Sequence, residues 1–482
     1  MTESLRPESP AVGAGLTRRR FLEGTAVAAA GLIGACSGGS RRGGTALSTT
    51  SSPAAPTTST TVSVATSIGA AATLPGSRPR PDLPAGTDML PQIDHIVVVM
   101  MENHSFDNYF GMLGRGDGFT LDNRGRPTAM NADASGRHVQ AFHMPTSCQL
   151  PHKPATAWSA THTQWNNGRN DGFVRSDSGP VAMGYWTGQD LPFYYGLART
   201  FPLADRWFAS CLTQTYPNRR FLMAGTALGW IDHETPSAKD PVPPNGTIFD
   251  RLNDHGITWK NYYSDLPQLA LFLPVLAANA AHVAKIDRYF ADAAAGTLPG
   301  FSLVDPNFTK TSEEDPQDIQ IGEAFAARVI TAAMQGPGWP KTLLVWLYDE
   351  HGGYFDHVPP PAAVKPDDVA PNLAPTDIPG AYDRYGFRVP AVVVSPYARR
   401  DYVSHVVHDH TSILKLVETK WNLPALTYRD AAADNLLDSL DLHSPPAFVT
   451  PPLLPPPANT SGTSSCAATG AGQIPPAEAI TA

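Results

Sequence analysis

The sequence predicts an α/β protein in which a mostly parallel central sheet is flanked by helices. Three continuous apolar runs, residues 96–101, 342–348 and 391–394, have the length and β-branched content of strands buried on both faces. Weaker strand candidates are residues 257–262 and 301–304, and apolar residues recur at helical spacing in 322–334 and 412–421. Strands that alternate with helices favour a parallel sheet covered on both sides.

Composition sets limits on function. The chain has 482 residues, of which 42% are hydrophobic and 16% charged, so a large core is expected. The formal net charge of −9, without a Lys/Arg cluster, argues against nucleic-acid binding. No CxxC pair exists among the four cysteines, which argues against a thiolate zinc site.

The N-terminal 36 residues predict an export signal. Two consecutive arginines before Phe21 and Leu22 precede a short apolar stretch, residues 26–35, which is typical of the Tat route. Ile33-Gly34-Ala35-Cys36 resembles a lipobox, with Cys36 as a lipidated first residue of the mature protein. The alternative is ordinary cleavage near Ala35 and a secreted protein.

Both flanks of the folded unit are poor in residues that build a core. Residues 37–90 are rich in Ser, Thr, Gly, Ala and Pro, which predicts a disordered tether. Residues 444–482 have a similar composition and predict a disordered tail. The folded unit is therefore expected at 91–443, held by the lipid anchor at the outer face of a membrane.

The first polar cluster follows the predicted strand 96–101. Glu102, Asn103, His104 and Ser105 come directly after it, where ligands bind in open α/β sheets. Asn103 or Ser105 would also serve as the N-cap of a helix starting near Phe106. Capping does not explain Glu102, because a carboxylate at the core edge needs a partner or a metal.

A second cluster repeats this pattern. The predicted strand 342–348 ends in Asp349, Glu350 and His351, followed by two glycines. Adjacent carboxylates repel each other unless a cation or a proton lies between them, and oxygen ligands suit divalent cations. A polar turn capped by His351 is the alternative. Two strands that end alike favour a metal site.

Between these clusters, residues 213–220 contain a candidate nucleophile. Pro217 fits the first turn of a helix, which places Thr215 at or just before the helix N-terminus. A hydroxyl there faces backbone N–H groups that bind phosphate, although a plain N-cap is the alternative. Asn218 and Arg219 would add donors for phosphate oxygens.

Longer motifs resemble a known family. These are Met-Glu-Asn-His-Ser-Phe-Asp-Asn-Tyr-Phe-Gly, Thr-Tyr-Pro-Asn-Arg, Trp-Asn-Asn-Gly-Arg-Asn-Asp-Gly-Phe, Asp-Glu-His-Gly-Gly-Tyr-Phe-Asp-His-Val-Pro-Pro, and Ser-Pro-Tyr-Ala with Asp-His-Thr-Ser-Ile-Leu. They resemble the bacterial phosphoesterase family of the alkaline-phosphatase superfamily. That family contains zinc-independent phospholipases C and acid phosphatases. The resemblance covers the folded unit and implies an alkaline-phosphatase-like fold.

The resemblance also implies roles for individual residues. Thr215 is expected to be the nucleophile, and His152 and His357 are expected to lie near the leaving group. One divalent metal, which would be Mn, Fe, Ca, Mg or Zn, is expected on Glu102, Asn103, Asp349 and Glu350. Asn218, Arg219 and His351 are expected to bind substrate. Asp315 departs from the pattern, because many members carry histidine before the following proline.

Three functions fit these expectations. A phospholipase C would hydrolyse phosphatidylcholine-type lipids, an acid phosphatase would hydrolyse small phosphomonoesters, and a non-catalytic envelope protein would only bind. The cysteines of the folded unit leave a separate question open. Cys148 and Cys211 either bridge, which requires Cα atoms within about 7 Å, or remain buried thiols.

Overall fold

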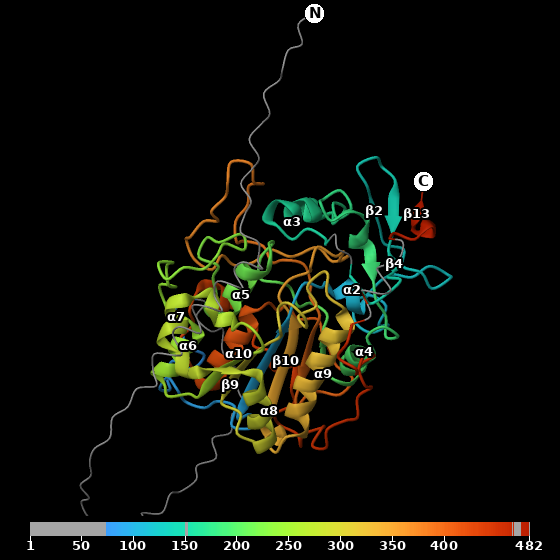
Figure 1. Cartoon of the computed structure of the whole chain (residues 1–482). Helices are drawn as coiled ribbons and strands as arrows, with labels where there is room; N and C mark the ends of the chain where they lie inside the picture. Colours follow the sequence, from blue (N-terminus) through green and yellow to red (C-terminus); the bar gives the residue numbers. More distant parts are fainter. Residues whose placement is uncertain (1–73, 150–152, 465, 467–473, 482) are drawn as a thin grey trace, which may run out of the picture.

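The computed structural model describes residues 74–149, 153–464, 466 and 474–481. An eight-stranded sheet forms the centre of the molecule, and helices flank it (Figure 1). The strands, in spatial order, are β12 (Val403–Ser404), β6 (Leu203–Ala204), β11 (Ala391–Val394), β10 (Thr342–Tyr348), β1 (His95–Met101), β9 (Phe301–Asp305), β7 (Trp259–Tyr263) and β8 (Val283–Lys285). The predicted α/β fold is confirmed.

The sheet is mixed but mostly parallel. Strand β1 pairs in parallel with both β10 and β9, whereas β11 runs antiparallel to β10 and β6. Residues 96–101 of β1 are fully buried, which explains their unbroken apolar character. Met101 pairs with Tyr348 in the β1–β10 register. The residues that follow the two strands therefore emerge side by side at one sheet edge.

The helices include all those that the sequence predicts. Their bounds are α2 (Phe106–Phe110), α3 (Trp158–Trp165), α4 (Pro192–Thr200), α5 (Thr215–Ala224), α6 (Ile248–Asp254), α7 (Leu273–Ala278), α8 (Ile286–Ala295), α9 (Ile319–Gln335), α10 (Thr411–Trp421) and α11 (Tyr428–Ala432). Helices α8 and α9 contact each other (Figure 1), and α9 packs on β10. Among the described residues, no helix is both long and apolar enough to cross a membrane.

Two small sheets complete the fold. One contains β2 (Met130–Ala132), β3 (His138–Gln140) and β13 (Ile480–Thr481), and the other contains β4 (Phe142–His143) and β5 (Gly184–Tyr185). Strand β13 comes from the C-terminal end of the chain and pairs antiparallel with β3. Two distant segments of sequence therefore share one sheet.

The folded unit extends beyond its predicted N-terminal boundary. The backbone N–H of Gly76 donates to Ala425 at 2.8 Å, and that of Met89 donates to Lys420 at 2.7 Å. The side chain of Asn422 accepts from Arg80 N at 2.8 Å. Residues 74–90 therefore pack beside the end of α10, and their assignment to the tether is wrong. The rest of the tether and the export signal lie outside the described residues.

The prediction of a disordered C-terminal tail is also wrong for the part that the structure describes. Phe448 packs on Phe201 with ring centroids 4.8 Å apart, and its carbonyl accepts from Trp339 Nε1 at 2.9 Å. Ala458 N donates to Glu323 at 3.1 Å. A proline-rich segment of low complexity can thus dock as an extended strap when the domain offers aromatic and acidic partners.

The cysteines pair differently from the prediction. Cys148 forms a disulfide with Cys466, with Cα atoms 5.3 Å apart, and Cys211 is a buried free thiol. The predicted bridge between Cys148 and Cys211 is therefore wrong, and the alternative of two buried thiols is correct only for Cys211. The reason is the docked tail, which brings Cys466 to a partner 318 residues away.

Replacing Cys466 with serine is expected to destabilise the protein. The bridge closes a very long loop, and such bridges contribute about 2–4 kcal/mol to the free energy of unfolding. Denaturant unfolding of the wild type and the Cys466→Ser variant measures the difference. A thiol reductant should lower the stability of the wild type to that of the variant and leave the variant unchanged. Equal stability of all four samples would contradict the bridge.

Candidate active site

The two polar clusters meet at the edge where β1 and β10 end. Glu102 and Asp349 follow these paired strands, and both are fully buried. Asn103 N donates to Asp349 Oδ1 at 3.1 Å. Asn103 adopts a left-handed backbone with φ of +70°, which turns the chain sharply after the strand. The structure thus joins the two clusters that the sequence predicted separately.

Arg219 neutralises part of the buried negative charge. Its Nε donates to Asp349 Oδ2 at 2.9 Å, and its second guanidinium nitrogen lies 3.7 Å from Glu102 Oε1. The same nitrogen donates to Met101 O at 3.0 Å. Arg219 is 2% exposed, so its guanidinium is committed to the acidic residues and the strand end. Its predicted role in binding phosphate stays a prediction.

Thr215 is the first residue of α5, after the N-cap Gln214. Its Oγ1 donates to Asn103 Oδ1 at 3.2 Å. The alternative that Thr215 is itself a plain N-cap is therefore wrong. The side chain of Gln214 makes no capping hydrogen bond, and the positive end of the helix dipole lies at Thr215. The hydroxyl therefore lies between a helix N-terminus and the acidic cluster.

The turn after β10 brings Glu350 and His351 into the same buried region. Glu350 Oε2 accepts from Gly352 N at 2.7 Å and lies 3.1 Å from His351 Nδ1. The other ring nitrogen of His351 contacts Gln164 at 2.7 Å, and burial lowers the pKa of His351 to about 3. Gly352 has φ of +69°, and a Cβ atom there would lie 1.8 Å from Asn103 O. Only glycine fits this approach of the two turns.

The donor set fits a divalent cation. Glu350 Oε1 is buried without a hydrogen-bond partner among the described residues. The guanidinium of Arg219 pairs with two of the three buried carboxylates, those of Glu102 and Asp349, whereas Glu350 contacts His351 instead. Oxygen donors of this kind suit Mg²⁺, Ca²⁺, Mn²⁺ and related ions. The side chains of Asn103 and Thr215 would supply further oxygens.

Cation binding is expected to weaken as the pH falls. Burial raises the pKa of Glu350 to about 8, so without a cation its carboxyl is mostly protonated at neutral pH. A cation requires the carboxylate, and binding should therefore release a proton. Below pH 8, the affinity should fall by up to about tenfold per pH unit. Calorimetric titrations with Mn²⁺ at several pH values measure this, and a pH-independent affinity would contradict it.

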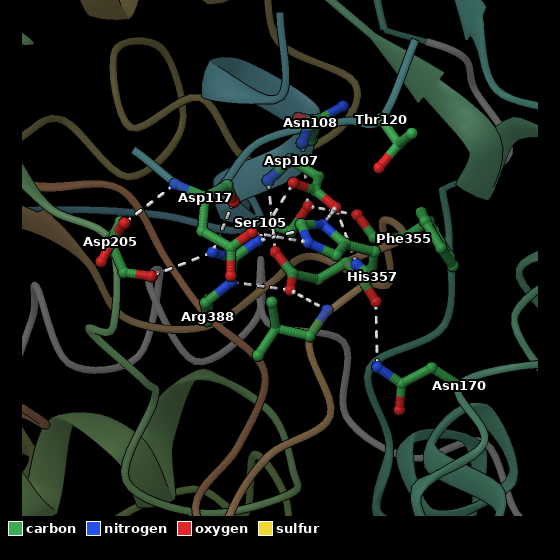
Figure 2. Close-up of polar contacts among 12 residues, drawn as sticks. Ser105, Asp107, Asn108, Asp117, Thr120, Asn170, Asp205, Phe355, His357 and Arg388 are labelled. Atoms are coloured by element: carbon green, nitrogen blue, oxygen red, sulfur yellow. Dashed lines mark hydrogen bonds and ion pairs between the residues drawn. The ribbon is translucent and has the colours of Figure 1, made fainter. Parts of the chain in front are cut away.

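His357 lies in a neighbouring ionic cluster (Figure 2). Its Nδ1 contacts Asp107 Oδ2 at 2.7 Å, and its Nε2 lies 3.2 Å from Asp117 Oδ1. Buried Arg388 pairs with Asp107 at 3.1 Å and Asp356 at 2.8 Å. Burial lowers the pKa of His357, but the hydrogen bond and charge of Asp107 outweigh this effect and raise it to about 9. His357 is therefore an imidazolium at neutral pH.

The remaining predicted residues occupy different surroundings. The Asn218 side chain accepts from Cys211 N at 3.0 Å and donates to Thr213 O at 2.9 Å. It thereby holds the turn before α5, and its role in binding substrate stays a prediction. His152 lies outside the described residues. Among the described residues, no hydrogen bond or ion pair joins His357 to Thr215 directly.

The sequence-based prediction gave no role in the site to three residues that lie near it. His410 Nε2 donates to the backbone oxygen of Asp349 at 2.7 Å, and Gln164 orients His351 as described above. Asp315 is buried and accepts from the Tyr354 hydroxyl at 3.1 and 3.2 Å. Burial raises the pKa of Asp315 well above its usual range. The signal in the sequence was that His410 and Tyr354 lie within the recognised motifs.

Comparison with known proteins identifies the family. The family model described as the phosphoesterase family matches residues 93–424, which is most of the chain. The chain belongs to the phosphoesterase family. The matched residues include every strand of the sheet and both halves of the site. As a phosphoesterase, the protein is a hydrolase that acts on phosphoric ester bonds.

Relatives of this phosphoesterase occur in bacteria and plants. Phospholipase C B of Mycobacterium tuberculosis is 30% identical over 74% of this chain and 79% of its own length. Non-specific phospholipase C1 of Arabidopsis thaliana is 30% identical, with coverages of 75% and 74%. The non-hemolytic phospholipase C of Pseudomonas aeruginosa is 28% identical and is matched over 58% of its length. A solved alkaline phosphatase superfamily structure from Vibrio parahaemolyticus aligns with a TM-score of 0.37 and 11% identity over 77% of this chain and 74% of that chain.

Proposed function

We propose that this phosphoesterase is a metal-dependent phospholipase C that hydrolyses phosphatidylcholine-type lipids through a phosphothreonine on Thr215. The observation that carries the proposal is the position of Thr215 Oγ1. It lies at the start of α5 and 3.2 Å from Asn103 Oδ1, next to the carboxylate cluster. A hydroxyl in that position is oriented for attack on phosphorus. The named relatives are phospholipases C, which supports a lipid diester as the substrate.

The proposed reaction has two displacements. Thr215 Oγ1 loses its proton and bonds to phosphorus, while the bond from phosphorus to the glycerol oxygen breaks and diacylglycerol leaves with a proton. Water then attacks phosphorus, and the bond to Thr215 Oγ1 breaks to release phosphocholine. The first-turn N–H groups of α5 stabilise negative charge on the phosphate oxygens. A bound divalent cation would lower the pKa of the Thr215 hydroxyl and neutralise charge on the phosphate.

A histidine is proposed to protonate the leaving diacylglycerol. His357 is one candidate, because Asp107 keeps it protonated at neutral pH and its side chain is 31% exposed. His152 is the other candidate, on sequence grounds. A protonated imidazole can give its proton to the glycerol oxygen as the ester bond breaks. The pH dependence of kcat for His152→Gln and His357→Gln variants distinguishes the two.

A two-substrate assay tests the proposal. The purified protein, stripped with chelator and reloaded with Mn²⁺, Mg²⁺, Ca²⁺, Zn²⁺ or Fe²⁺, is given phosphatidylcholine vesicles or p-nitrophenyl phosphate. Release of phosphocholine, together with weak phosphomonoester hydrolysis, is expected. Faster hydrolysis of the phosphomonoester would favour the acid phosphatase alternative. Binding of both substrates without turnover under any loading would favour a non-catalytic envelope protein.

The same proposal includes export and a lipid anchor at Cys36. The supporting observations are the twin arginines, the apolar run 26–35 and the residues before Cys36. Two acyl chains on Cys36 would hold the protein stably at a membrane. Expression of the wild type and a Cys36→Ala variant in a Tat-competent bacterium with labelled fatty acid tests this. Equal labelling of both proteins would favour ordinary secretion.

A further inference from the structure

A second group of potential metal ligands lies at the β12 edge of the central sheet. His408 follows β12, and Asp434 and Asp438 lie in the segment after α11. One ligand atom from each of the three side chains can be chosen so that all lie within 4.8 Å of one another. His408 is 1% exposed, and its ring is covered by Trp207 with centroids 5.6 Å apart. None of the three side chains belongs to the candidate active site.

The polar atoms that face this group are not satisfied by the protein. His408 Nδ1 and Asp438 Oδ1 are both buried and have no hydrogen-bond partner among the described residues. The other oxygen of Asp438 accepts from the hydroxyls of Ser404 and Tyr402. Those bonds fix the carboxylate, and its unpartnered oxygen lies 3.7 Å from His408 Nε2. Because Nε2 also contacts Ser404 Oγ at 3.2 Å, Nδ1 is the ring nitrogen that is left for a bound group. Burial of such groups without a partner is costly, which indicates that a bound group completes the site.

The distances differ from those of ordinary ion pairs in the same molecule. His408 Nδ1 lies 3.7 Å from Asp434 Oδ1, and His408 Nε2 lies 3.7 Å from Asp438 Oδ1. Three other His–Asp pairs are in direct hydrogen-bond contact, namely His357–Asp107 at 2.7 Å, His143–Asp190 at 2.7 Å and His405–Asp205 at 2.9 Å. Around a cation with metal–ligand distances of about 2.0–2.5 Å, neighbouring ligand atoms lie roughly 3–3.6 Å apart. The ligand atoms at His408 lie within 4.8 Å of one another and are not in hydrogen-bond contact, which leaves room for an ion between one ring nitrogen and the two carboxylates.

We propose that His408, Asp434 and Asp438 form a structural site for a divalent cation that accepts nitrogen and oxygen ligands, such as Zn²⁺. Two carboxylates and one imidazole supply the charge and the ligand types that such an ion requires. Among the described residues, no lysine or arginine forms an ion pair with either aspartate. The Asp434 side chain is 40% exposed, which leaves a path from solvent to the site.

The ion would fasten residues 434–438 to a segment that contacts the candidate active site. His408 lies two residues before His410, and His410 holds the backbone of Asp349 at 2.7 Å. The backbone of His408 is itself fixed by Arg206 O at 3.0 Å and Phe208 N at 2.8 Å. Linking this segment to residues 434–438 would stabilise the residues that lead into α10. The proposal does not depend on which phosphoester the enzyme hydrolyses.

Zinc content and zinc-dependent stability test this site. Chelator-treated full-length wild type and an Asp434→Asn/Asp438→Asn variant are dialysed against Zn²⁺ and analysed for metal. The variant is expected to hold about one equivalent per chain less, and to lose most of the increase in melting temperature that Zn²⁺ gives the wild type. Equal zinc content and equal melting shifts would overturn the proposal.

Two controls separate zinc binding from folding. Asp401→Asn changes an exposed aspartate beside β12, where a φ of +50° suits asparagine, and should behave as the wild type. The single Asp434→Asn variant keeps Asp438 and its hydrogen bonds to Tyr402 and Ser404 intact, so it should fold in the metal-free state with the wild-type melting temperature. Its zinc-dependent melting shift should nevertheless be smaller than that of Asp401→Asn. A shift equal to that of Asp401→Asn would show that Asp434 is not a ligand.

Discussion

Replacing Thr215 with alanine is expected to abolish phosphoester hydrolysis and to leave the fold intact. Among the described residues, the only side-chain hydrogen bond of Thr215 is the 3.2 Å contact to Asn103, so its loss should cost about 1 kcal/mol of stability. Removing a nucleophile that has no substitute typically lowers kcat by at least about 10⁴-fold. Phosphocholine release and chemical denaturation of the Thr215→Ala variant measure the two effects.

The matched variant is Thr215→Ser, which keeps the hydroxyl and removes one methyl group. It should retain a substantial part of the wild-type rate, and acid quenching during turnover should trap a phosphorylated protein. The Thr215→Ala protein should trap no phosphate at this position. Near-normal turnover by Thr215→Ala would mean that another residue attacks phosphorus.

The centre of the fold was predictable because its strands are continuous apolar runs. Residues 96–101 lie in the middle of the sheet, where both faces are covered, so no polar alternation interrupts them. The abrupt change from these apolar runs to the polar residues after β1 and β10 marked the candidate site in the sequence. The family resemblance assigned Glu102 and Asp349 to one metal site, and the parallel pairing of β1 with β10 explains why the two residues meet at one edge of the sheet.

Other features depend on contacts between distant residues that composition does not encode. The pKa of His357 is set by Asp107, and Arg388 completes that cluster from 281 residues beyond Asp107. The proline-rich composition of the tail predicted disorder. The tail nevertheless docks on aromatic side chains, and a disulfide joins its Cys466 to Cys148. Such long-range pairings leave no periodic pattern in the sequence.

A substitution that removes one charge at Asp349 discriminates between metal-ligating and merely structural carboxylates. Asp292→Asn is the matched control, because Asp292 is also buried and also paired, with Lys260 at 2.8 Å and Arg288 at 2.7 Å, but belongs to α8. Asp292→Asn should lower stability by about 1–3 kcal/mol and keep both metal and activity. It thereby measures what the loss of a buried ion pair does on its own.

Asp349→Asn itself is expected to lose metal and activity together. Asp349 Oδ1 accepts from the backbone of Asn103 and Glu350, and Oδ2 accepts from Arg219 at 2.9 Å. Both oxygens of Asp349 accept hydrogen bonds, whereas asparagine has only one side-chain oxygen. Its amide NH₂ group would therefore face either the two backbone N–H groups or the guanidinium, which are also donors. We therefore expect loss of one metal equivalent and a fall in kcat/KM of at least about 10³-fold. Elemental analysis and vesicle assays measure these, and full metal with full activity would remove Asp349 from the site.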